Sequence, residues 1–481
     1  MTASAHGSAN AEVIRRLREE NVERVRVAWC DLHGIFRGKT LMPHAVADAL
    51  TQGVGMVSTL MLKDTSDRTA YKVFEAGDVQ GLEGFGFANN LLLRPDPASF
   101  RVLPWATGTG WMQGQLHLPD GSPVRFDPRQ VLRLALERLH HAGFALRCGL
   151  EVEFHIYRIE DSRLDPTQAG WPGEPPAVSM IHPGYSLLAE SCADQADEAL
   201  RIVQHTALGL NLPLRSLEIE LGPSQVEAVF DAGEAMQVAD QMALFRNGVK
   251  QALRRAGYHA SFMCLPPFEN VMASGWHLHH SLVELASGKN AFMRATPAPR
   301  SDHDNAEHAL SATGAAWLAG LLAHARGMAA FCATTVNGYG RFKPHAMAPM
   351  AALWGRDNRG AMLRVLGAAG DAATRIENRL GEPMANPYLY IAAQVHAGLD
   401  GVERGLHAPA ATHTPYGDAA VALPASLGEA LDALAADTTL TAAFGAQLVN
   451  CWTRIKRSEQ TRFDAAADPA QWQRREYFGR Y

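Results

Sequence analysis

The sequence predicts an α+β protein with a small β-rich N-terminal domain and a larger C-terminal region in which strands and helices alternate. Four separated stretches place acids, histidines and arginines at every second position, with apolar residues between them, which is typical of strands that bury one face. Longer segments between these stretches repeat leucine, valine and alanine at helical spacing. At 481 residues the chain exceeds the usual size of one core, so two or three domains are expected.

The first part of the chain predicts a β-rich domain over residues 12–118. Gly34 suits the positive φ of a turn after its first strand. The Pro/Gly-containing stretch 119–123 is typical of a linker, so a second domain is expected over 120–481. The elements expected in the first domain are a helix at 12–20 and extended segments at 25–29, 90–94 and 111–117.

The second domain is expected to open with a helix at 128–142. Asp127 is its predicted N-cap and Gly143 its predicted end. This helix leads into the strand that carries Glu151, and the Pro/Gly-rich stretch 165–176 is expected to be a surface loop. Further helices are expected at about 193–210, 234–256, 304–331, 386–399 and 439–460.

Composition favours an enzyme that acts on small molecules. The formal net charge of -6, without long runs of one sign, argues against a nucleic-acid binder and gives no reason to expect a membrane-surface protein. The six cysteines show no paired or zinc-like spacing, which fits a reducing compartment without disulfides. The first residues lack signal-peptide character, and no stretch reaches the roughly 20 apolar residues of a membrane span. A cytoplasmic location is expected.

The acids on the strand faces predict a site for divalent metal ions. Two glutamates on one strand are usually solvated, but a Gly-Pro turn between Glu220 and Glu227 returns a second carboxylate to the same place. Adjacent carboxylates repel unless cations lie between them, and Mg²⁺ or Mn²⁺ accepts carboxylate oxygens with one imidazole. The alternative is a set of unrelated surface acids. The candidate ligands are Glu151, Glu153, Glu220, Glu227, His277 and Glu377.

A second group of candidates is cationic and lies in one short part of the sequence. Arginine forks match phosphate and carboxylate oxygens, so arginines beside divalent metals indicate phosphoryl transfer from ATP. A basic surface is the alternative. Neither a P-loop nor a protein-kinase motif is present, so an ATP site must belong to another fold. These arginines are Arg341, Arg359, Arg364, Arg375 and Arg379.

In their order and spacing these segments resemble the glutamine synthetase family over nearly the whole chain. Residues 220–227 resemble the family's E-x-x-P-G-Q-x-E stretch, and residues 274–281 its G-S-G-M-H-x-H-x-S segment. The other matching segments are 27–39, 149–153, 358–364, 375–379 and 385–389. The resemblance implies a β-grasp-like N-terminal domain and a catalytic domain built on a curved antiparallel sheet flanked by helices. It also implies a homo-oligomer of stacked rings with active sites between neighbouring subunits.

The same resemblance implies a role for each matching residue. One metal ion would be held by Glu153, Glu220 and Glu227, and a second by Glu151, His277 and Glu377, with two or three Mg²⁺ or Mn²⁺ ions per site. ATP would contact His279, Ser281, Arg359, Arg364 and Arg375. The acid substrate would contact Arg341 and Arg379, and the remaining candidates for substrate contact are Trp276, Met272 and Ala273. Arg341, Arg359 and Met347 are the candidate catalytic positions.

Three departures from the family pattern lie at the substrate end of the site. Ammonia-using members carry a glutamate in the flap R-x-x-P-G-Y-E-A-P, where this chain has Met347. The family's ammonium-binding aspartate has no convincing counterpart in residues 62–67. Met272-Ala273 replaces an Asn-Gly pair that contacts the amino-acid end of glutamate, so the acid is glutamate or a different carboxylic acid.

The loss of the flap glutamate favours an organic amine over ammonia. Amide formation needs the neutral amine. An alkylamine with a pKa near that of lysine, about 10.4, is neutral in only roughly one molecule in a few thousand at pH 7. The use of ammonia therefore requires acidic side chains nearby. Methionine offers apolar surface instead, and Trp276, Phe342 and Trp354 either add aromatic surface or belong to the core. An arylamine, neutral at pH 7, needs the least help from a base.

These observations together predict an ATP-dependent ligase that joins the γ-carboxylate of glutamate to an apolar alkylamine or an arylamine through a γ-glutamyl phosphate. Three alternatives remain open. A polyamine γ-glutamyl synthetase would place acids along the amine channel to meet the second ammonium group. The other two are an ordinary glutamine synthetase that uses ammonia and a catalytically silent, ring-forming structural or sensor relative.

Overall fold

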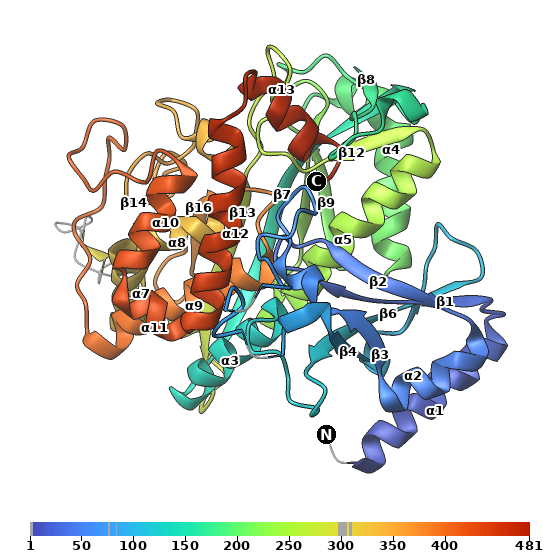
Figure 1. The fold of residues 1–481 in the computed structure, drawn as a ribbon. Coiled ribbons are helices and arrows are strands. Elements are labelled where there is room, and N and C mark those ends of the chain that lie inside the picture. Colours follow the sequence, from blue (N-terminus) through green and yellow to red (C-terminus); the bar gives the residue numbers. More distant parts are fainter. Residues whose placement is uncertain (1–2, 76, 83, 297–304, 307–309) are drawn as a thin grey trace.

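The N-terminal part of the chain forms a six-stranded sheet in the order β2-β1-β6-β4-β3, with β5 beside β6. The computed structural model describes residues 3–75, 77–82, 84–296, 305–306 and 310–481 (Figure 1). Strand β1 pairs parallel with β6 and antiparallel with β2. The strands of this sheet are β1 (Arg24–Cys30), β2 (Phe36–Leu41), β3 (Val54–Val57), β4 (Asn90–Pro95), β5 (Arg101–Val102) and β6 (Thr109–His117).

The larger part of the chain is built on a ten-stranded sheet in the order β14-β15-β16-β13-β7-β10-β9, with β8, β11 and β12 also paired to β7. Except for the parallel pair β14 and β15, its neighbouring strands are antiparallel. Its strands are β7 (Phe144–Asp161), β8 (Ala177–Met180), β9 (Leu214–Ile219), β10 (Gln225–Phe230), β11 (Gly233–Glu234), β12 (Tyr258–Ser261), β13 (Trp276–Glu284), β14 (Trp354–Arg356), β15 (Leu363–Leu366) and β16 (Arg375–Gly381).

Helices pack around both sheets. Their bounds are α1 (Ala3–Glu19), α2 (Val46–Gln52), α3 (Pro128–His141), α4 (Glu190–Gly209), α5 (Ala235–Arg255), α7 (Ala312–Ala323), α8 (Ala325–Cys332), α9 (Pro387–Arg404), α10 (Leu427–Ala436), α11 (Thr438–Phe444), α12 (Ala446–Asp464) and α13 (Pro469–Gln473). A short 3₁₀ helix, η6 (Gly338–Arg341), precedes the loop that carries Met347.

The two faces of the large sheet differ in chemistry. On β7 the even-numbered side chains point toward α5, where the ring of Phe154 lies 5.9 Å from that of Phe245. On β13 Trp276 lies opposite Val152 of β7 and packs edge-on against Tyr390 of α9, with ring centroids 4.9 Å apart. The odd-numbered residues of both strands therefore face away from the α5 and α9 layer, and the candidate site lies on that other face.

Most expected helices are present, but two of them are interrupted. The segment expected as one helix at 304–331 forms α7 and α8, which meet at His324 at an angle of 76°. Residues 304 and 307–309 of that prediction lie outside the described residues. The helix expected at 439–460 divides at Gly445, whose φ of +81° cannot continue a right-handed helix. The helix α1 begins at Ala3 rather than at residue 12, whereas Asp127 caps α3 as expected through the amides of residues 129 and 130.

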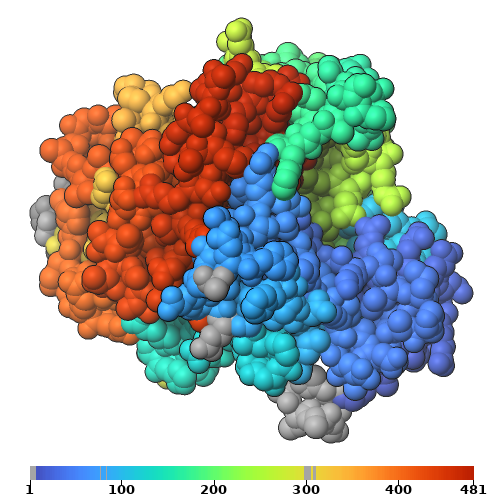
Figure 2. Space-filling model, viewed as in Figure 1, coloured from blue at the N-terminus to red at the C-terminus, as the bar shows by residue number. Residues whose placement is uncertain are grey.

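The N-terminal sheet packs closely against the C-terminal helices. Figure 2 shows the blue N-terminal part directly beside the red C-terminal part. Asp64 accepts a hydrogen bond from Arg462 of α12 at 3.1 Å, and the buried hydroxyls of Thr65 and Ser66 donate to Glu476. Strand β6 ends at His117 and α3 begins at Pro128. A domain boundary between 118 and 120 stays a prediction.

Among the described residues, none of the helices taken singly has the length and apolar composition to cross a membrane. The pair α7 and α8 meets both criteria only when its two bent halves are counted together.

Candidate active site

Four adjacent strands bring the predicted metal ligands to one face of the large sheet. His277 of β13 lies opposite Glu151 of β7, and Glu227 of β10 lies opposite Glu153 of β7. On the other edge of β13, the backbone of His279 pairs with that of Glu377 in β16. The alternation of the four sequence stretches thus becomes a single polar surface in the fold.

The side chains on this face are close enough to share ions. The Nδ1 atom of His277 lies 3.7 Å from Oε2 of Glu151 and 3.8 Å from Oε1 of Glu377. Its Nε2 atom lies 3.8 Å from Oε1 of Glu153. The Nε2 atom of His279 lies 3.0 Å from Oε1 of Glu151. Imidazole nitrogens and carboxylate oxygens at these distances are donor atoms that a divalent metal ion would use.

Among the described residues, two groups of donor atoms have the spacing of metal sites, and they divide the ligands differently from the expected sets. Glu151, Glu227 and His277 form one group, and Glu151, His279 and Glu377 form the other, with the ligand atoms of each within 4.8 Å of one another. His279, expected beside the nucleotide, therefore lies among the metal-ligand candidates. The remaining two candidate ligands, Glu153 and Glu220, belong to neither compact group.

Glu153 is instead tied to the chain around it. Its Oε2 atom accepts hydrogen bonds from the amide of Gly275 at 2.9 Å and from Nε2 of Gln225 at 3.2 Å. Glu220 follows β9 and accepts from the amide of Leu221 at 3.2 Å. Burial together with the charge of Glu220 raises the pKa of Glu153 to about 7. These two carboxyl groups border the site, and a cation bound there would favour their ionised forms.

Carboxylate crowding is strongest at Glu227. Burial, followed by the charges of Glu153 and Glu151, raises the pKa of Glu227 to about 10. A divalent cation among these oxygens would favour the ionised form and remove this repulsion. The donor set of carboxylates with one or two imidazoles therefore fits Mg²⁺ or Mn²⁺.

Glu377 has the opposite environment. Its carboxylate is fully buried and accepts from Arg364 at 2.9 Å and from Arg379. Burial by itself would raise its pKa, but His277 and Arg379 more than offset this and hold the pKa below its usual value. In the same way, the rings of His277 and His279 outweigh burial and lower the pKa of Glu151.

The five arginine candidates do not form one cluster. Arg375 donates through Nε to Nδ1 of His279 at 3.0 Å, and Arg364 bridges Glu377 and Asp357. Arg359 is exposed and lines a separate cavity of about 310 Å³ with Asp357 and Thr412. Asp357 links this cavity to the metal-ligand face through Arg364. No sequence pattern had singled out Asp357, because one aspartate in a loop carries no distinguishing signal.

Arg341 is held by the backbone of β16. Its guanidinium donates to the carbonyl of Arg379 at 2.7 Å and to that of Gly381 at 3.1 Å. A side-chain carbon placed on Gly275 would lie 2.8 Å from Nη2 of Arg341 and 3.0 Å from Nε2 of His277. A side chain at position 275 would therefore have to displace one of these two polar groups.

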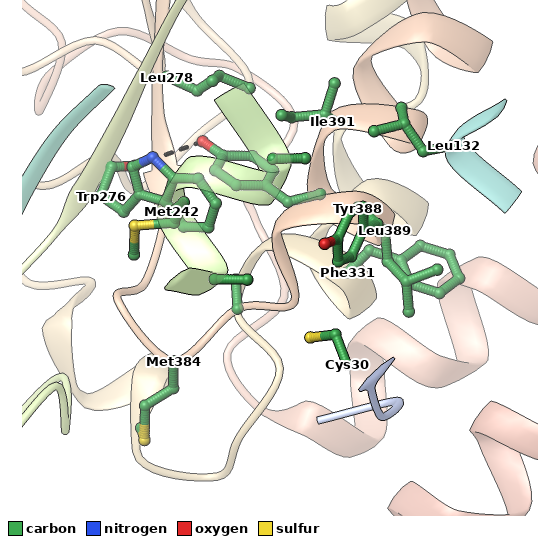
Figure 3. Packing of buried hydrophobic residues seen from close by; sticks show 14 of the residues in the cluster. Cys30, Leu132, Met242, Trp276, Leu278, Phe331, Met384, Tyr388, Leu389 and Ile391 are labelled. Atoms are coloured by element: carbon green, nitrogen blue, oxygen red, sulfur yellow. Dashed lines mark hydrogen bonds between the residues drawn. The ribbon is translucent and has the colours of Figure 1, made fainter. Parts of the chain in front are cut away.

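Trp276 does not line the site. Its side chain is fully buried in the core, where Met242 lies next to it in the view of Figure 3 and Tyr390 packs against its ring. The expectation of aromatic surface beside the amine is wrong for this residue. Consecutive residues of a strand point to opposite faces, and Trp276 directly precedes His277. Trp354 is likewise fully buried and donates to the carbonyl of Pro409 at 2.7 Å, while Ser281 lies on the same side of β13 as His277 and His279.

The loop with Met347 borders the site next to Arg379. Met347 is 50% exposed, and its carbonyl accepts from Nη2 of Arg379 at 3.2 Å. Its φ of +50° is unusual for a residue other than glycine. Met272 and Ala273 are half-buried, and the carbonyl of Ala273 accepts from Gln225 at 3.2 Å. Gln225 also contacts Glu153, so residues 272 and 273 adjoin the acidic face.

Comparison with known proteins identifies the family of this chain. The model of the glutamine synthetase catalytic domain matches residues 125–477. The chain belongs to the glutamine synthetase family. Members of this family are ligases that form carbon–nitrogen bonds, and the mixed sheet flanked by helices is the glutamine synthetase fold, as expected from the sequence. The family is also ATP- and divalent-metal-dependent, in agreement with the metal-like donor groups.

Curated relatives within the family differ in the product that their names state. A gamma-glutamylanilide synthase of Acinetobacter sp. is 39% identical over 97% of this chain and 95% of its own length. The gamma-glutamylethanolamide synthetase GlnA4 of Streptomyces coelicolor is 30% identical over 96% and 93%. A glutamine synthetase of Thermus thermophilus is 30% identical over 99% and 100%.

Solved structures agree with this assignment. A GmaS/ADP complex has a TM-score of 0.76 at 27% identity and covers 95% of this chain and 97% of its own. A structure described as a novel glutamine synthase homolog has a TM-score of 0.77 at 26% identity, with 96% and 99% coverage.

Proposed function

We propose that this protein is an ATP-dependent ligase that joins the γ-carboxylate of glutamate to an apolar alkylamine or an arylamine. The proposal depends mainly on the residue at position 347. By resemblance, Met347 stands where ammonia-using members of the family carry the flap glutamate. Its side chain is half exposed beside Arg379, at the edge of the acidic face. The 39% identity to a gamma-glutamylanilide synthase supports the same choice of amine.

In the proposed reaction, an oxygen of the γ-carboxylate attacks the terminal phosphorus of ATP and ADP leaves. The resulting γ-glutamyl phosphate is then attacked at its carbonyl carbon by the neutral amine, phosphate leaves, and the amine nitrogen loses a proton. Bound divalent ions would neutralise charge on the phosphates. The residues that would hold them are Glu151, Glu153, Glu220, Glu227, His277, His279 and Glu377.

The chain's arginines have separate tasks in this scheme. Arg359, Arg364 and Arg375 would contact the phosphates of ATP, since guanidinium forks match phosphate oxygens. Arg379 would hold the acid substrate. Arg341 is fixed by three carbonyls of β16, and we propose that its charge beside His277 attracts the same substrate. Ser281 would line the nucleotide pocket.

We also propose a homo-oligomer of stacked rings in which neighbours complete each active site. Phe74 and Phe87 of the N-terminal part are 75% and 81% exposed, and a contact with a neighbouring subunit would remove these apolar side chains from water. Light scattering after size exclusion would measure the assembly mass. A cytoplasmic location belongs to the same proposal, and the six cysteines, all buried and unpaired, are compatible with it.

The test is ADP formation by the purified protein with glutamate, ATP, Mg²⁺ and one amine at a time. The panel consists of ammonia, ethylamine, a diamine and aniline, and we expect kcat/KM at least about a hundredfold higher for the best apolar amine than for ammonia, which is about 2.7 kcal/mol. Equal turnover with ammonia would show an ordinary glutamine synthetase. A preference for the diamine would indicate the polyamine alternative.

The catalytically silent alternative predicts a different result. No metal-dependent ADP formation would then be seen with any amine in the panel, or when other carboxylic acids replace glutamate. Mass spectrometry of the product separates this outcome from uncoupled ATP hydrolysis, since only the ligase yields a γ-glutamyl amide.

A further inference from the structure

A cleft lined by positive charge lies far from the metal-ligand face. A cavity of about 430 Å³ opens between α5, the turn before β2 and the C-terminal residues. The basic residues that line it are Arg246, Lys250, Arg254, Arg255 and Arg480, and we call this set the cationic cleft. A neighbouring cavity of about 470 Å³ shares Lys250, Arg254 and Arg480 with it.

The large sheet separates the cationic cleft from the active site. Helix α5 packs on the even-numbered face of β7 through Phe245 and Phe154. The candidate metal ligands Glu151 and Glu153 lie on the odd-numbered face. The basic residues of α5 therefore cannot contact a nucleotide bound at the metal-ligand face.

Most basic residues of the cationic cleft lack an acidic partner at ion-pair distance among the described residues. Within the described parts of the chain, no ion pair involves Lys250, Arg254, Arg255 or Arg480. Lys250 donates only to the carbonyl of Ala260, at 3.1 Å. Arg246, in contrast, has several hydrogen-bond partners. Its guanidinium donates to the carbonyls of Gly34, Pro383 and Ala385.

The arrangement of these charges costs free energy in the absence of an anion. Arg246, Lys250 and Arg254 are four residues apart on α5, so they share one helix face, where like charges repel. Burial and the charges of Arg246 and Arg254 lower the pKa of Lys250 to about 7. Burial and the charges of Arg255 and Arg24 likewise lower the pKa of Arg26 in the adjacent β1.

We propose that the cationic cleft binds a small polyanion that carries phosphate or carboxylate groups. Arginine forks match both kinds of oxyanion, and the cavity has the size of a small-molecule site. Phe36 lines the same cavity and offers apolar surface to the rest of such a ligand. The site is independent of the proposed ligase reaction.

The experiment is calorimetric titration of the full-length, EDTA-treated protein with pyrophosphate, and separately with tricarballylate to test carboxylate binding. The cleft variant is R254Q/R480Q. The charge-matched control is R201Q/R215Q, whose arginines pair with Asp197 and Asp231 on the surface. We expect the Kd to rise at least tenfold in the cleft variant and less than twofold in the control.

A third variant, R375Q, separates this site from the active site. If pyrophosphate and tricarballylate bind equally well to the wild type and to R254Q/R480Q, or if only R375Q weakens binding, the proposal is overturned. Lack of binding to the wild type overturns it as well. If neither anion binds and R254Q/R480Q changes the assembly mass in sedimentation velocity, the cleft is a subunit contact instead. Circular dichroism of each variant checks that it is folded.

Discussion

At the scale of single residues, adjacent residues of β13 have different roles: one contributes to the hydrophobic core and the next to the candidate site. His277 faces the acids, while Trp276 fills the core. The same alternation lets the sequence predict the acidic face correctly, because a period of two is set by strand geometry. It also explains the wrong expectation for Trp276, which followed from the family segment rather than from the strand period.

Exchange of Met347 for glutamate tests the amine preference. The M347E variant restores a carboxylate that attracts ammonium and removes apolar surface from the loop beside Arg379. We expect the ratio of kcat/KM for ammonia to that for the best apolar amine to rise at least tenfold, about 1.4 kcal/mol. M347L keeps the apolar surface and should retain the wild-type ratio, and an unchanged ratio in M347E would remove Met347 from the account of specificity.

Crowding of carboxylates predicts a pH-dependent stability in the metal-free protein. Because folding raises the pKa of Glu227 from its unfolded value near 4.5 to about 10, the folded chain holds this proton more tightly. The contribution to stability is complete below about pH 4.5 and is lost as pH rises toward 10. Urea unfolding in EDTA should show this loss between pH 5 and pH 9, and saturating Mg²⁺ should reverse it.

The variant E227Q isolates this contribution. It cannot ionise, so its loss of unfolding free energy between pH 5 and pH 9 should be smaller than that of the wild type by about 1–3 kcal/mol. The exposed Glu137 of α3 supplies the control E137Q, which should match the wild type. An equal loss of unfolding free energy in E227Q and the wild type between pH 5 and pH 9 would contradict the proposed repulsion among the carboxylates.

At the scale of elements, capped ends follow from local sequence, whereas breaks inside long apolar segments depend on tertiary partners. Asp127 before α3 is an example of the first kind. The bend at His324 is of the second kind, because its ring bridges Asp400 of α9 and Asp437 at the start of α11 at 2.9 and 2.7 Å. Both aspartates are distant in sequence, so periodicity alone predicted one continuous helix there.

The bend at His324 predicts a second pH effect. Burial alone would lower the pKa of His324, but the hydrogen bonds to Asp437 and Asp400 outweigh it and raise the pKa. The stabilisation is therefore complete below the unfolded pKa near 6.5 and decreases as pH rises through the folded pKa. H324A should lower the unfolding free energy by about 1.5–3 kcal/mol at pH 6 and by less at pH 9.

A histidine on the surface provides the comparison for this measurement. His205 of α4 is exposed, so H205A should change stability little at either pH. A cost for H324A that is equal at pH 6 and pH 9 would mean that packing, rather than the charge of the imidazolium, holds the bend.

At the scale of the whole molecule, a buried polar network joins the N-terminal sheet to the C-terminal end. Glu476 is 1% exposed and accepts from Thr65, Ser66 and Arg462. Burial alone would raise its pKa, but Arg462 and the two hydroxyls hold the pKa below its usual value. The sequence predicted two domains, yet it gave no indication of this contact, because its partners are separated by about four hundred residues of chain.

Loss of the charge on Glu476 should weaken the whole molecule. E476Q leaves Arg462 with one buried acid partner fewer, and we expect the unfolding free energy to fall by about 3 kcal/mol. The adjacent R475Q breaks a half-exposed pair with Glu174 and should cost less than about 1 kcal/mol. Denaturation in urea measures both, and equal costs would indicate that the network adds no more than a surface ion pair.

The two-sided strand β13 limits how such an enzyme can diverge. A one-residue shift in the register of β13 would move Trp276 to the acidic face and a histidine into the core. Such a shift would therefore damage the core and the site together. The loop with Met347 carries no such double constraint, since its side chain is half exposed. New amine preferences are therefore expected to arise by substitution in that loop, while the strands that hold the acids are retained across lineages.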